Sequence, residues 1–472
     1  MSRGSVAAVV ADGLARAGVP RVFASCHASA PLIAALRAHG LAVVETAGAT
    51  AACVMAAVTA ELIDAPGVAL VSLADGLVPV IDGAAHAMRD RDAVIVISDA
   101  ATDSRLLAPV VKTTVVVDPA SAGHWIAHAA QAAMADPRGA VHLAVTPEVA
   151  DAPALPIATA VRHAAPAAPS ADALDALADS IARAGKPVIV AGLETGPDDA
   201  KWLRALAESV PAPVLTTPKG KGALPDPHPL ALGLLAAGHP LLTQSDLLVV
   251  VGVDQVEVSP GVWPAGVSMV RVGRTPHDDA VVGEIALVIE ELAPRLRGRT
   301  RADWDVAALD RIKRGLRAAA PAGPGLARRR VVELAREMTP AGTLLTLDVP
   351  LAAAWQSVAP RECLVANGAA TLGFALPAAL AAALARPDAR VVAVGAAAGF
   401  AAMAGEWCTA ARLRAPSVAV ALNHAGTTDV ASGARAAGVD VATATDETSF
   451  RAAFDRAWRA GAACLVDAHV SR

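Results

Sequence analysis

Three short stretches of this chain carry residues that could do chemistry at the end of a strand. The first is Gly-Ala-Ala-Ala-Gly at residues 395–399, which follows the apolar run VVAV. The second is Asn423 and His424 after VAVAL, and the third is Cys26 beside His27 after RVFAS. A glycine-rich turn leading into a helix is typical of a phosphate site, because backbone N–H groups at the helix start attract anions. This turn, however, carries no acid that could hold a metal ion.

The cysteine and the histidines each admit two interpretations. A cysteine next to a histidine, as in Cys26 and His27, could act as a thiolate nucleophile. Adjacent residues at a strand end point in opposite directions, however, which favours an accidental pair. His424 could bind a metal together with Asp75 or Asp429, but a single histidine at a strand end is more often only hydrogen-bonded.

Alternating strands and helices must position these residues. Short Val, Leu and Ile runs separated by alanine-rich helical segments are typical of buried parallel strands. A helix is expected over 401–414, and with its flanking strands it forms a βαβ unit whose ligands lie at the carboxyl ends of the strands. Strands are expected at 21–26, 41–46, 68–74, 93–98, 140–145, 187–192, 213–217, 246–252, 268–273, 343–348, 363–368, 391–395, 418–423 and 464–470.

Two stretches rich in Pro, Ala and Gly, 151–170 and 318–326, lack hydrophobic periodicity and are expected to be linkers. They divide the 472 residues into pieces of a common domain size, 1–155, 165–317 and 327–472. The expected fold class is therefore α/β, with three consecutive parallel-sheet domains.

Composition argues against several other classes of protein. The net charge of -5 gives no cationic surface for nucleic acid. The uncharged run 365–385 is long enough to cross a bilayer, but it is rich in Ala and Gly and contains Pro, so a buried strand, loop and helix are expected instead of a membrane span. The first ten residues do not resemble a signal peptide. The five cysteines show no Cys-x-x-Cys spacing, which argues against zinc and disulfide frameworks and favours a cytoplasmic protein with reduced thiols.

Five stretches, in order along the chain, resemble the thiamine diphosphate-dependent 2-oxo acid enzymes, among them acetolactate synthase and benzoylformate decarboxylase. They are GVPRVFA, AACVMAA, PVVKTT with GAVHLAVTPEVAD, PVLTTPKGKGALPDPHPLALG and NGAATLGFALPAALAAALARPDARVVAV. The resemblance implies a pyrimidine-binding, a central and a diphosphate-binding domain. It also implies a homodimer or homotetramer with a small-molecule ligand in the cleft between subunits, and it allows for a catalytic partner subunit.

The resemblance also assigns cofactor residues, and the sequence departs from the family at these positions. The family's catalytic glutamate falls on Ala49, while Glu45 lies four residues earlier on the preceding strand. The family's Gly-Asp-Gly metal motif has Ala397 in place of the aspartate, and its Asn-Asn pair falls on Asn423 and His424. Mg²⁺ requires oxygen ligands in near-octahedral geometry, and alanine supplies none.

Other cleft positions follow from the same resemblance. The family's Gly-Pro-Gly loop becomes Ala-Asp-Gly, with Gly76 as its last residue. Leu372 stands where an apolar residue of the family bends the cofactor, although it would equally serve as a core leucine. The family's Phe-Gly-x-Pro-Gly turn ends here in Cys26 and His27, which places this pair at the substrate-facing turn.

Two hypotheses from different classes remain. In the first, the chain is an acetolactate synthase-like pseudoenzyme that has lost thiamine diphosphate and Mg²⁺, has no metal site, and scaffolds or regulates a partner. In the second, it is a working decarboxylase or carboligase with unusual cofactor handling, or a lyase or transferase that uses the vacated cleft, with Cys26 and His27 as catalytic candidates. Lys219 and Lys221 could contact an anionic nucleotide, as the central domain does with FAD in some relatives, but lysines of this kind are more often solvated loop residues.

Overall fold

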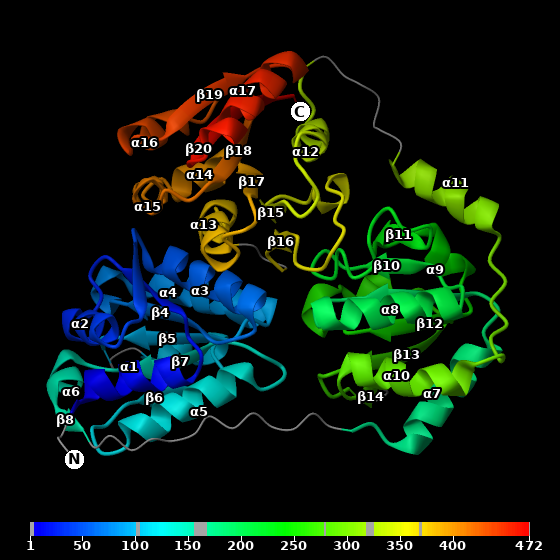
Figure 1. The fold of residues 1–472 in the computed structure, drawn as a ribbon, viewed down its shortest axis with the longest axis horizontal. Helices are drawn as coiled ribbons and strands as arrows, with labels where there is room; N and C mark the ends of the chain where they lie inside the picture. Colours follow the sequence, from blue (N-terminus) through cyan, green and yellow to red (C-terminus); the bar gives the residue numbers. More distant parts are fainter. Residues whose placement is uncertain are drawn as a thin grey trace. The chain divides into compact units, whose positions relative to one another are not determined.

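The computed structural model describes residues 4–100, 104–154, 168–277, 280–317, 325–367 and 371–471. Each of the three expected domains contains one six-stranded sheet (Figure 1). Within the sheets, the strand pairs for which a register is defined are parallel. The α/β fold with three parallel-sheet domains is therefore confirmed. The domain boundaries remain predictions, because most of both expected linkers lies outside the described residues.

The N-terminal sheet has the order β3-β2-β4-β5-β7-β6. Helices α1, α2 and α5 pack on one face over a core of Val, Leu, Ile and Ala side chains, while α3 and α4 pack together on the other side. The strands are β2 (Arg21–Ser25), β3 (Ala42–Thr46), β4 (Gly67–Val71), β5 (Val94–Ser98), β6 (Thr114–Val116) and β7 (Val141–Ala144). The helices are α1 (Val6–Arg16), α2 (Ala30–Ala38), α3 (Ala49–Ile63), α4 (Leu77–Asp90), α5 (Ala122–Met134) and α6 (Pro147–Asp151), and the short strands β1 (Gly4–Ser5) and β8 (Pro153–Ala154) pair antiparallel.

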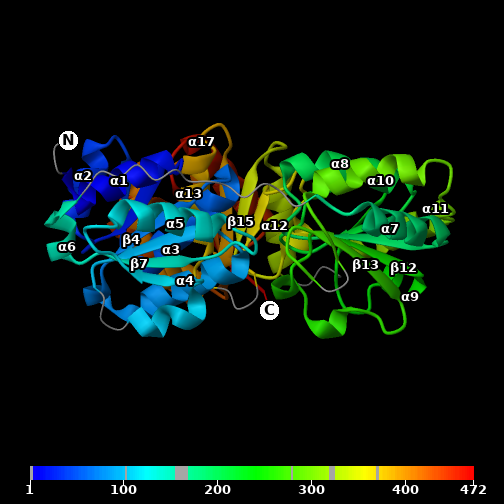
Figure 2. The same cartoon turned by 90° about the horizontal axis from the view of Figure 1, so that it is seen from below.

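The central sheet has the order β11-β10-β9-β12-β13-β14. Figure 2 shows α7, α8 and α10 on one face of this sheet and α9 on the other, and each face has its own apolar core. The strands are β9 (Pro187–Ala191), β10 (Val214–Thr216), β11 (Ala231–Leu234), β12 (Leu247–Val251), β13 (Ser268–Gly273) and β14 (Ala280–Val282). The helices are α7 (Ala171–Arg183), α8 (Pro197–Ser209), α9 (Pro240–Gln244), α10 (Ile285–Leu296) and α11 (Val306–Arg317).

The C-terminal sheet has the order β16-β15-β17-β18-β20-β19. Its strands are β15 (Leu344–Leu347), β16 (Cys363–Val365), β17 (Val391–Ala396), β18 (Ser417–His424), β19 (Asp440–Ala444) and β20 (Cys464–Val470). The helices are α12 (Arg328–Glu337), α13 (Ala375–Ala385), α14 (Ala397–Ala402), α15 (Glu406–Leu413), α16 (Ala431–Ala436) and α17 (Glu447–Ala460). The run 365–385 thus includes the end of β16 and all of α13, and no helix among the described residues is long and apolar enough to cross a membrane.

The single helix expected over 401–414 is wrong, because two helices occupy this region. Strand β17 continues to Ala396, α14 begins inside the glycine-alanine turn, and α15 starts only at Glu406. The interruption lies at Gly405, where an added Cβ would stand 2.7 Å from the Cβ of Ala47. The chain of the N-terminal domain comes so close here that only glycine fits without displacement.

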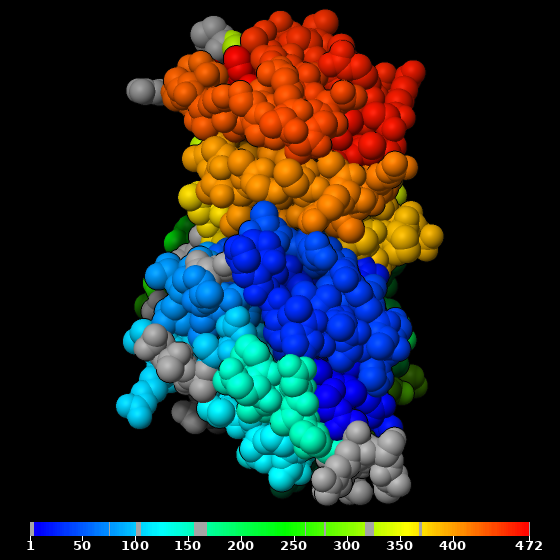
Figure 3. Space-filling model, turned by 90° about the vertical axis from the view of Figure 1, so that its left-hand side faces the viewer, coloured from blue at the N-terminus to red at the C-terminus, as the bar shows by residue number. Residues whose placement is uncertain are grey.

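The chain divides into two compact units that do not follow its linear order. One consists of 1–164, 346–349 and 369–472, and the other of 165–345 and 350–368. In the first unit, α3 packs against α13, so segments more than 300 residues apart lie side by side. Figure 3 shows the same proximity at the surface, where N-terminal residues in blue adjoin C-terminal residues in orange.

Candidate functional site

Asp348 supplies the acid that the glycine-alanine turn itself lacks. It follows β15, the neighbour of β17, and its Oδ1 accepts a hydrogen bond from the Ala396 N–H at 2.9 Å. The carboxylate is also hydrogen-bonded to the backbone of Ala375, and burial raises the pKa of Asp348 to about 6. A Cβ at Gly395 would lie 2.6 Å from Oδ1, and one at Gly399 would lie 2.8 Å from Oδ2. The two glycines therefore leave the space that this carboxylate fills.

The other turn positions offer little polar chemistry from their side chains. Ala397, the position predicted from the sequence for the family's aspartate, is the first residue of α14; it is buried and contributes only a methyl group. The backbone of Gly399 lies against Gly373, which has a φ of +83°. Next to Gly373, Leu372 is 59% exposed. The interpretation of Leu372 as a core leucine is therefore wrong, and its role beside a cofactor stays a prediction.

Asn423, at the end of β18, is buried and shapes the loop that follows it. Its Nδ2 donates to the Thr428 carbonyl at 2.8 Å and to Asp467 Oδ1 at 2.9 Å, and its Oδ1 accepts the Thr428 N–H at 3.1 Å. The other carboxylate oxygen of Asp467 lies 3.2 Å from His469 Nε2. His424, one residue further on, has an exposed side chain. Asn423 is thus buried and hydrogen-bonded within the domain, whereas the side chain of its neighbour His424 faces solvent.

Asp429, one of the two acids considered as a metal partner of His424, binds its own loop. Its Oδ1 accepts the N–H groups of Ala431 and Ser432 at 3.1 and 3.0 Å, next to the start of α16. Hydrogen bonds from Ser432 and Ala431 lower the pKa of Asp429. The side chain of the other acid, Asp75, lies outside the described part of the structure.

Cys26 and His27 lie just beyond the end of β2, and their side chains meet. The Cys26 Sγ is 3.5 Å from His27 Nδ1 and 3.6 Å from the carbonyl oxygen of Ala47, and both residues are exposed. The expectation that they point in opposite directions is therefore wrong. Alternation applies within a strand, but β2 ends at Ser25 and the pair lies in the turn that follows.

Ala49, the position predicted from the sequence for the family's catalytic glutamate, is the first residue of α3 and is buried. The segment before it is held by α15, because Glu406 Oε1 accepts the Ala47 N–H at 2.9 Å. Glu406 is 2% exposed, and burial raises its pKa. Glu45 points to the surface, where it pairs with Arg37 at 2.9 Å and Arg412 at 3.4 Å.

Gly76 lies at the carboxyl edge of the same N-terminal sheet. It connects a short 3-10 turn (Leu73–Asp75) to α4 with a φ of +107°, a conformation that glycine adopts readily. The turn is fixed by Asp99, whose carboxylate accepts the Ser72 hydroxyl at 2.6 Å and the Leu73 N–H at 2.9 Å. Gly76 and Cys26 thus both follow carboxyl ends of strands in this sheet.

Lys219 and Lys221 are both buried, so the expectation of solvated lysines is wrong. Lys221 forms an ion pair with Asp226 at 2.7 Å. The same edge of the central sheet holds Glu257, whose pKa burial raises to about 7 and which accepts the backbone N–H of Leu193. Lys221 and Glu257 therefore bind other residues of the loops at this edge of the central sheet.

Comparison with known protein families gives a match in each of the three sheet domains. The thiamine pyrophosphate enzyme N-terminal TPP binding domain matches residues 4–114, the central domain matches 174–292, and the C-terminal TPP binding domain matches 347–428. The chain belongs to the thiamine diphosphate-dependent 2-oxo acid enzyme family. The resemblance drawn from the five sequence stretches is thereby confirmed.

Acetolactate synthases are among the relatives of this family member. The catabolic acetolactate synthase of Raoultella terrigena is 29% identical over 342 residues, which cover 66% of this chain and 61% of that protein. The isozyme 1 large subunit of Escherichia coli is 29% identical over 258 residues, covering 50% and 45% of the two chains. The matched segments thus span 61% and 45% of these two relatives. The X-ray structure of a candidate thiamin diphosphate-dependent enzyme from Mycobacterium smegmatis has a TM-score of 0.84, with 21% identity over 99% of this chain and 100% of that one.

Two acids of this family member, the half-buried Asp348 and the buried Glu406, were not predicted as site residues from the sequence. Asp348 stands directly after an apolar run, and an acid at the carboxyl end of a predicted parallel strand is a signal that could have identified it. Glu406 has no comparable signal, because its partner Ala47 lies 359 residues away. Contacts across that sequence distance depend on how α15 and α3 pack.

Proposed function

We propose that this chain is an acetolactate synthase-like homologue whose magnesium-diphosphate site has lost its ligands and which does not perform standard thiamine catalysis. The observation that carries the proposal is the arrangement of Ala397 and Asp348. A methyl group stands at the position of the metal-binding aspartate, and the nearby acid binds backbone N–H groups of its own sheet edge.

The chemistry of the remaining side chains supports the same proposal. Mg²⁺ takes near-octahedral oxygen ligands, commonly carboxylates together with substrate phosphates. The carboxamide of Asn423 is engaged by Thr428 and Asp467, and His424 offers an imidazole, which suits zinc and other softer metals. These residues do not fit the family's Mg²⁺-diphosphate group.

The start of α3 gives a second line of support. The family's catalytic glutamate would stand at Ala49, and two acids beside the start of α3 already have other partners. Glu406 holds the backbone ahead of α3, and Glu45 forms surface ion pairs. The acid that promotes the reactive tautomer of the cofactor thus has no evident substitute among these residues.

Calorimetric and thermal-shift titration with thiamine diphosphate and Mg²⁺ tests this proposal. A ligand at 100 times its Kd stabilises a protein by about 2.7 kcal/mol, so a functional site would give a clear shift at micromolar cofactor. We expect no magnesium-dependent shift from the parent chain. We expect Ala397→Asp combined with His424→Asn to restore some binding, because these changes return a carboxylate and an amide oxygen.

Ala398→Asp is the matched control, because it places the same charge one residue further on, at an exposed position. If this control binds as well as the restored variant, added charge alone explains the gain. A magnesium-dependent shift of the parent chain would contradict the proposal outright.

A second function is favoured by the contact between Cys26 and His27. An exposed thiol 3.5 Å from an imidazole nitrogen is the arrangement of an activated cysteine nucleophile, and it would serve a lyase or transferase that uses the vacated cleft. Cys408 is also exposed and provides an internal comparison. If Cys26 is activated, iodoacetamide should alkylate it at pH 6 at least tenfold faster than Cys408, and His27→Gln should remove the difference. Equal rates in the parent chain would exclude this function.

We also propose that the chain is a cytoplasmic homodimer or homotetramer with a small-molecule ligand in the cleft between subunits. The support is family membership, and one relative is described as a large subunit, which makes a catalytic partner subunit a further option. Sedimentation velocity at micromolar concentration would measure the oligomeric state, and a strictly monomeric species would argue against the shared cleft.

A further inference from the structure

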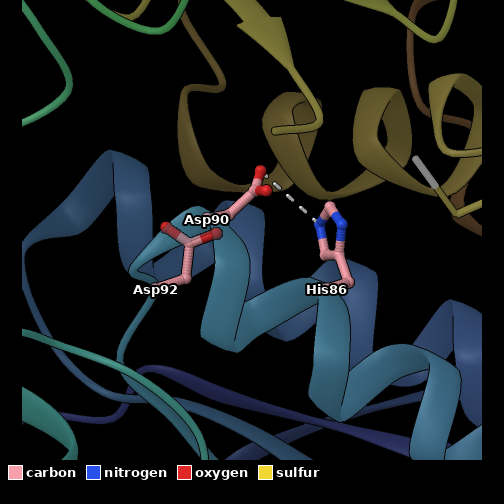
Figure 4. Close-up of side chains that lie close together, drawn as sticks. All are labelled: His86, Asp90 and Asp92. Carbon is pink, nitrogen blue, oxygen red and sulfur yellow. Dashed lines mark ion pairs between the residues drawn. The ribbon is translucent and has the colours of Figure 1, made fainter. Parts of the chain in front are cut away.

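Three buried side chains with metal-binding atoms meet at the C-terminal end of α4. His86 and Asp90 lie one turn apart on the helix, and Asp92 follows in the turn before β5. Their exposed fractions are 4%, 3% and 5%, so all three are withdrawn from solvent. Figure 4 shows the imidazole and the two carboxylates close together, with the ion pair between His86 and Asp90 as a dashed line. They form the one group of three or more potential ligands this close together among the residues that the structure describes.

The distances suit a small cation after modest side-chain movement. One ligand atom from each residue lies within 4.8 Å of the others, and His86 Nε2 is 3.9 Å from Asp90 Oδ2. A tetrahedral ion with bonds of about 2.1 Å holds its ligand atoms about 3.4 Å apart. The atoms therefore need to approach by up to about 1.4 Å, which side-chain rotation can supply.

The charge of this cluster favours a cation. Burying two carboxylates close together is costly unless positive charge compensates them. Asp90 is also the last residue of α4, where backbone carbonyl groups give the helix end a partial negative charge. A divalent ion would interact favourably with both carboxylates and with the helix end, in addition to the ion pair that Asp90 already forms with His86.

We propose that His86, Asp90 and Asp92 form a binding site for a divalent first-row transition metal ion such as Zn²⁺. One imidazole nitrogen with two carboxylate oxygens is a ligand set for zinc, manganese or iron, whereas Mg²⁺ and Ca²⁺ prefer oxygen alone. These three residues were not predicted as ligands from the sequence, because His-x-x-x-Asp-x-Asp does not match a common metal-binding motif.

The position of the site indicates a structural role. The cluster lies just before β5, at the amino end of the N-terminal sheet, whereas Cys26 and Gly76 follow carboxyl ends of strands. The ring of His86 also lies 5.2 Å from the ring of Phe374, next to α13. An ion bound here would hold the end of α4 to the turn before β5 and fix the histidine that contacts the C-terminal domain.

Zinc binding by the full-length chain tests the proposal. The parent for this test carries Cys26→Ser and Cys408→Ser, because exposed thiols bind Zn²⁺ themselves. After removal of metal with a chelator, equilibrium dialysis should give one Zn²⁺ per chain with a micromolar or lower Kd. Asp90→Asn and Asp92→Asn should each weaken this binding at least tenfold, since each removes a charged ligand.

His128→Gln is the matched control. His124 and His128 lie one turn apart on α5 with ring centroids 6.3 Å apart, and they are the most evident alternative zinc ligands on one helix face. The control should bind Zn²⁺ like the parent. A parent that binds no Zn²⁺ at 100-fold excess over ~1 μM protein, or binding that both aspartate variants leave unchanged, would overturn the proposal.

A measurement on the unmutated ligand set covers the case in which an aspartate variant fails to fold. Cadmium-113 NMR of the parent loaded with one equivalent of Cd²⁺ distinguishes nitrogen and oxygen ligands from thiolate by chemical shift. A single resonance in the nitrogen-oxygen range, displaced by Zn²⁺, would support the site. A resonance in the thiolate range, or none, would overturn it.

Discussion

Asp348 shows how one residue can change the interpretation of a motif. From sequence, the glycine-alanine turn has a phosphate-site pattern without an acid, and Asp348 appears only as the last residue of an apolar run. In the fold, the carboxylate fills the space beside Gly395 and Gly399 and holds the Ala396 N–H. The space that this carboxylate occupies therefore explains both glycines of the turn, without a phosphate.

The raised pKa of Asp348 predicts a pH dependence of stability. Its pKa is about 6 in the fold against an ordinary value of 3.8, so the unfolded chain loses this proton first as pH rises. Below about pH 4 the raised pKa makes its full contribution to the free energy of unfolding. This contribution is lost as the pH rises to about 6. The loss is up to about 3 kcal/mol, since one pKa unit corresponds to about 1.4 kcal/mol.

Asp348→Asn removes this titration, so its melting temperature relative to the parent should rise by several degrees between pH 4 and pH 7. Scanning calorimetry at intervals of one pH unit measures the difference. The comparison with the parent is needed because His142 makes the protein's stability depend on pH with the opposite sign. Burial lowers the pKa of His142 to about 4, so its contribution to stability is lost as the pH falls below 6.5. A constant difference between variant and parent across this range would contradict the raised pKa.

The place of a residue in the site could be predicted from the sequence where a family motif lies close to it in the chain. It could not be predicted where the residue's partner lies far away in the chain. Ala49, Ala397 and Asn423 were placed by counting from nearby motif residues. The capping of the Ala47 N–H by Glu406 could not be anticipated, because it depends on the packing of two domains. The contact of Cys26 with His27 was missed because the exact end of β2 was unknown.

At the level of elements, the strands of the six-stranded sheets that the sequence analysis missed are all at sheet edges. They are β6, β11, β14 and β19, and each of them ends a sheet; the two-residue strands β1 and β8, which pair with each other, were also missed. An edge strand is paired on one side only and is partly exposed, as in β6 and β14, so it does not need the continuous apolar run that marks a central strand. The fourteen expected strands were apolar enough to be recognised from composition alone.

The packing of α3 on β4 gives a prediction for a single glycine. A Cβ at Gly67 would overlap the carbonyl oxygen of Ala56 in the middle of α3, and neither backbone can move without separating helix and sheet. Gly67→Ala should therefore destabilise the protein by about 2–4 kcal/mol, above the usual cost of overpacking by a methyl group. Gly315→Ala is the matched control, because Gly315 lies inside α11 with open space around it.

The control should be neutral or stabilising by up to about 1 kcal/mol, since alanine favours a helix. Thermal unfolding of both variants beside the parent gives the two shifts. Equal shifts for Gly67→Ala and Gly315→Ala would mean that the close approach of α3 to β4 is not a constraint.

At the scale of the whole molecule, the three-domain α/β fold could be predicted because each sheet has a central group of strongly apolar strands. The grouping into two units could not, because it depends on α3 and α13. Twelve of the 15 residues of α3 and nine of the 11 residues of α13 are buried, and both helices are apolar on every side. Such helices have no polar face for solvent, and each requires cover from a neighbour.

This difference predicts how isolated fragments behave. The two cores of the central domain use residues between 173 and 312 only. A fragment of residues 168–317 should therefore unfold cooperatively, with an enthalpy of about 100 kcal/mol for its length near 60 °C. A fragment of residues 4–154 leaves α3 without α13, and it should associate or bind a hydrophobic dye.

Calorimetry and light scattering on the two fragments check both outcomes. The central fragment loses the two hydrogen bonds between Asp226 and Ser357, in which each backbone N–H donates to the other residue, and the one from Arg329 to the Leu316 carbonyl. These are loop and helix-end contacts that its two cores do not depend on. Absence of a cooperative transition in this fragment would show that residues 350–368 are needed to complete the domain. A monomeric, cooperatively folded 4–154 fragment would show that the sheet and α4 alone can shield α3, and that the contact with α13 adds little to the stability of the N-terminal domain.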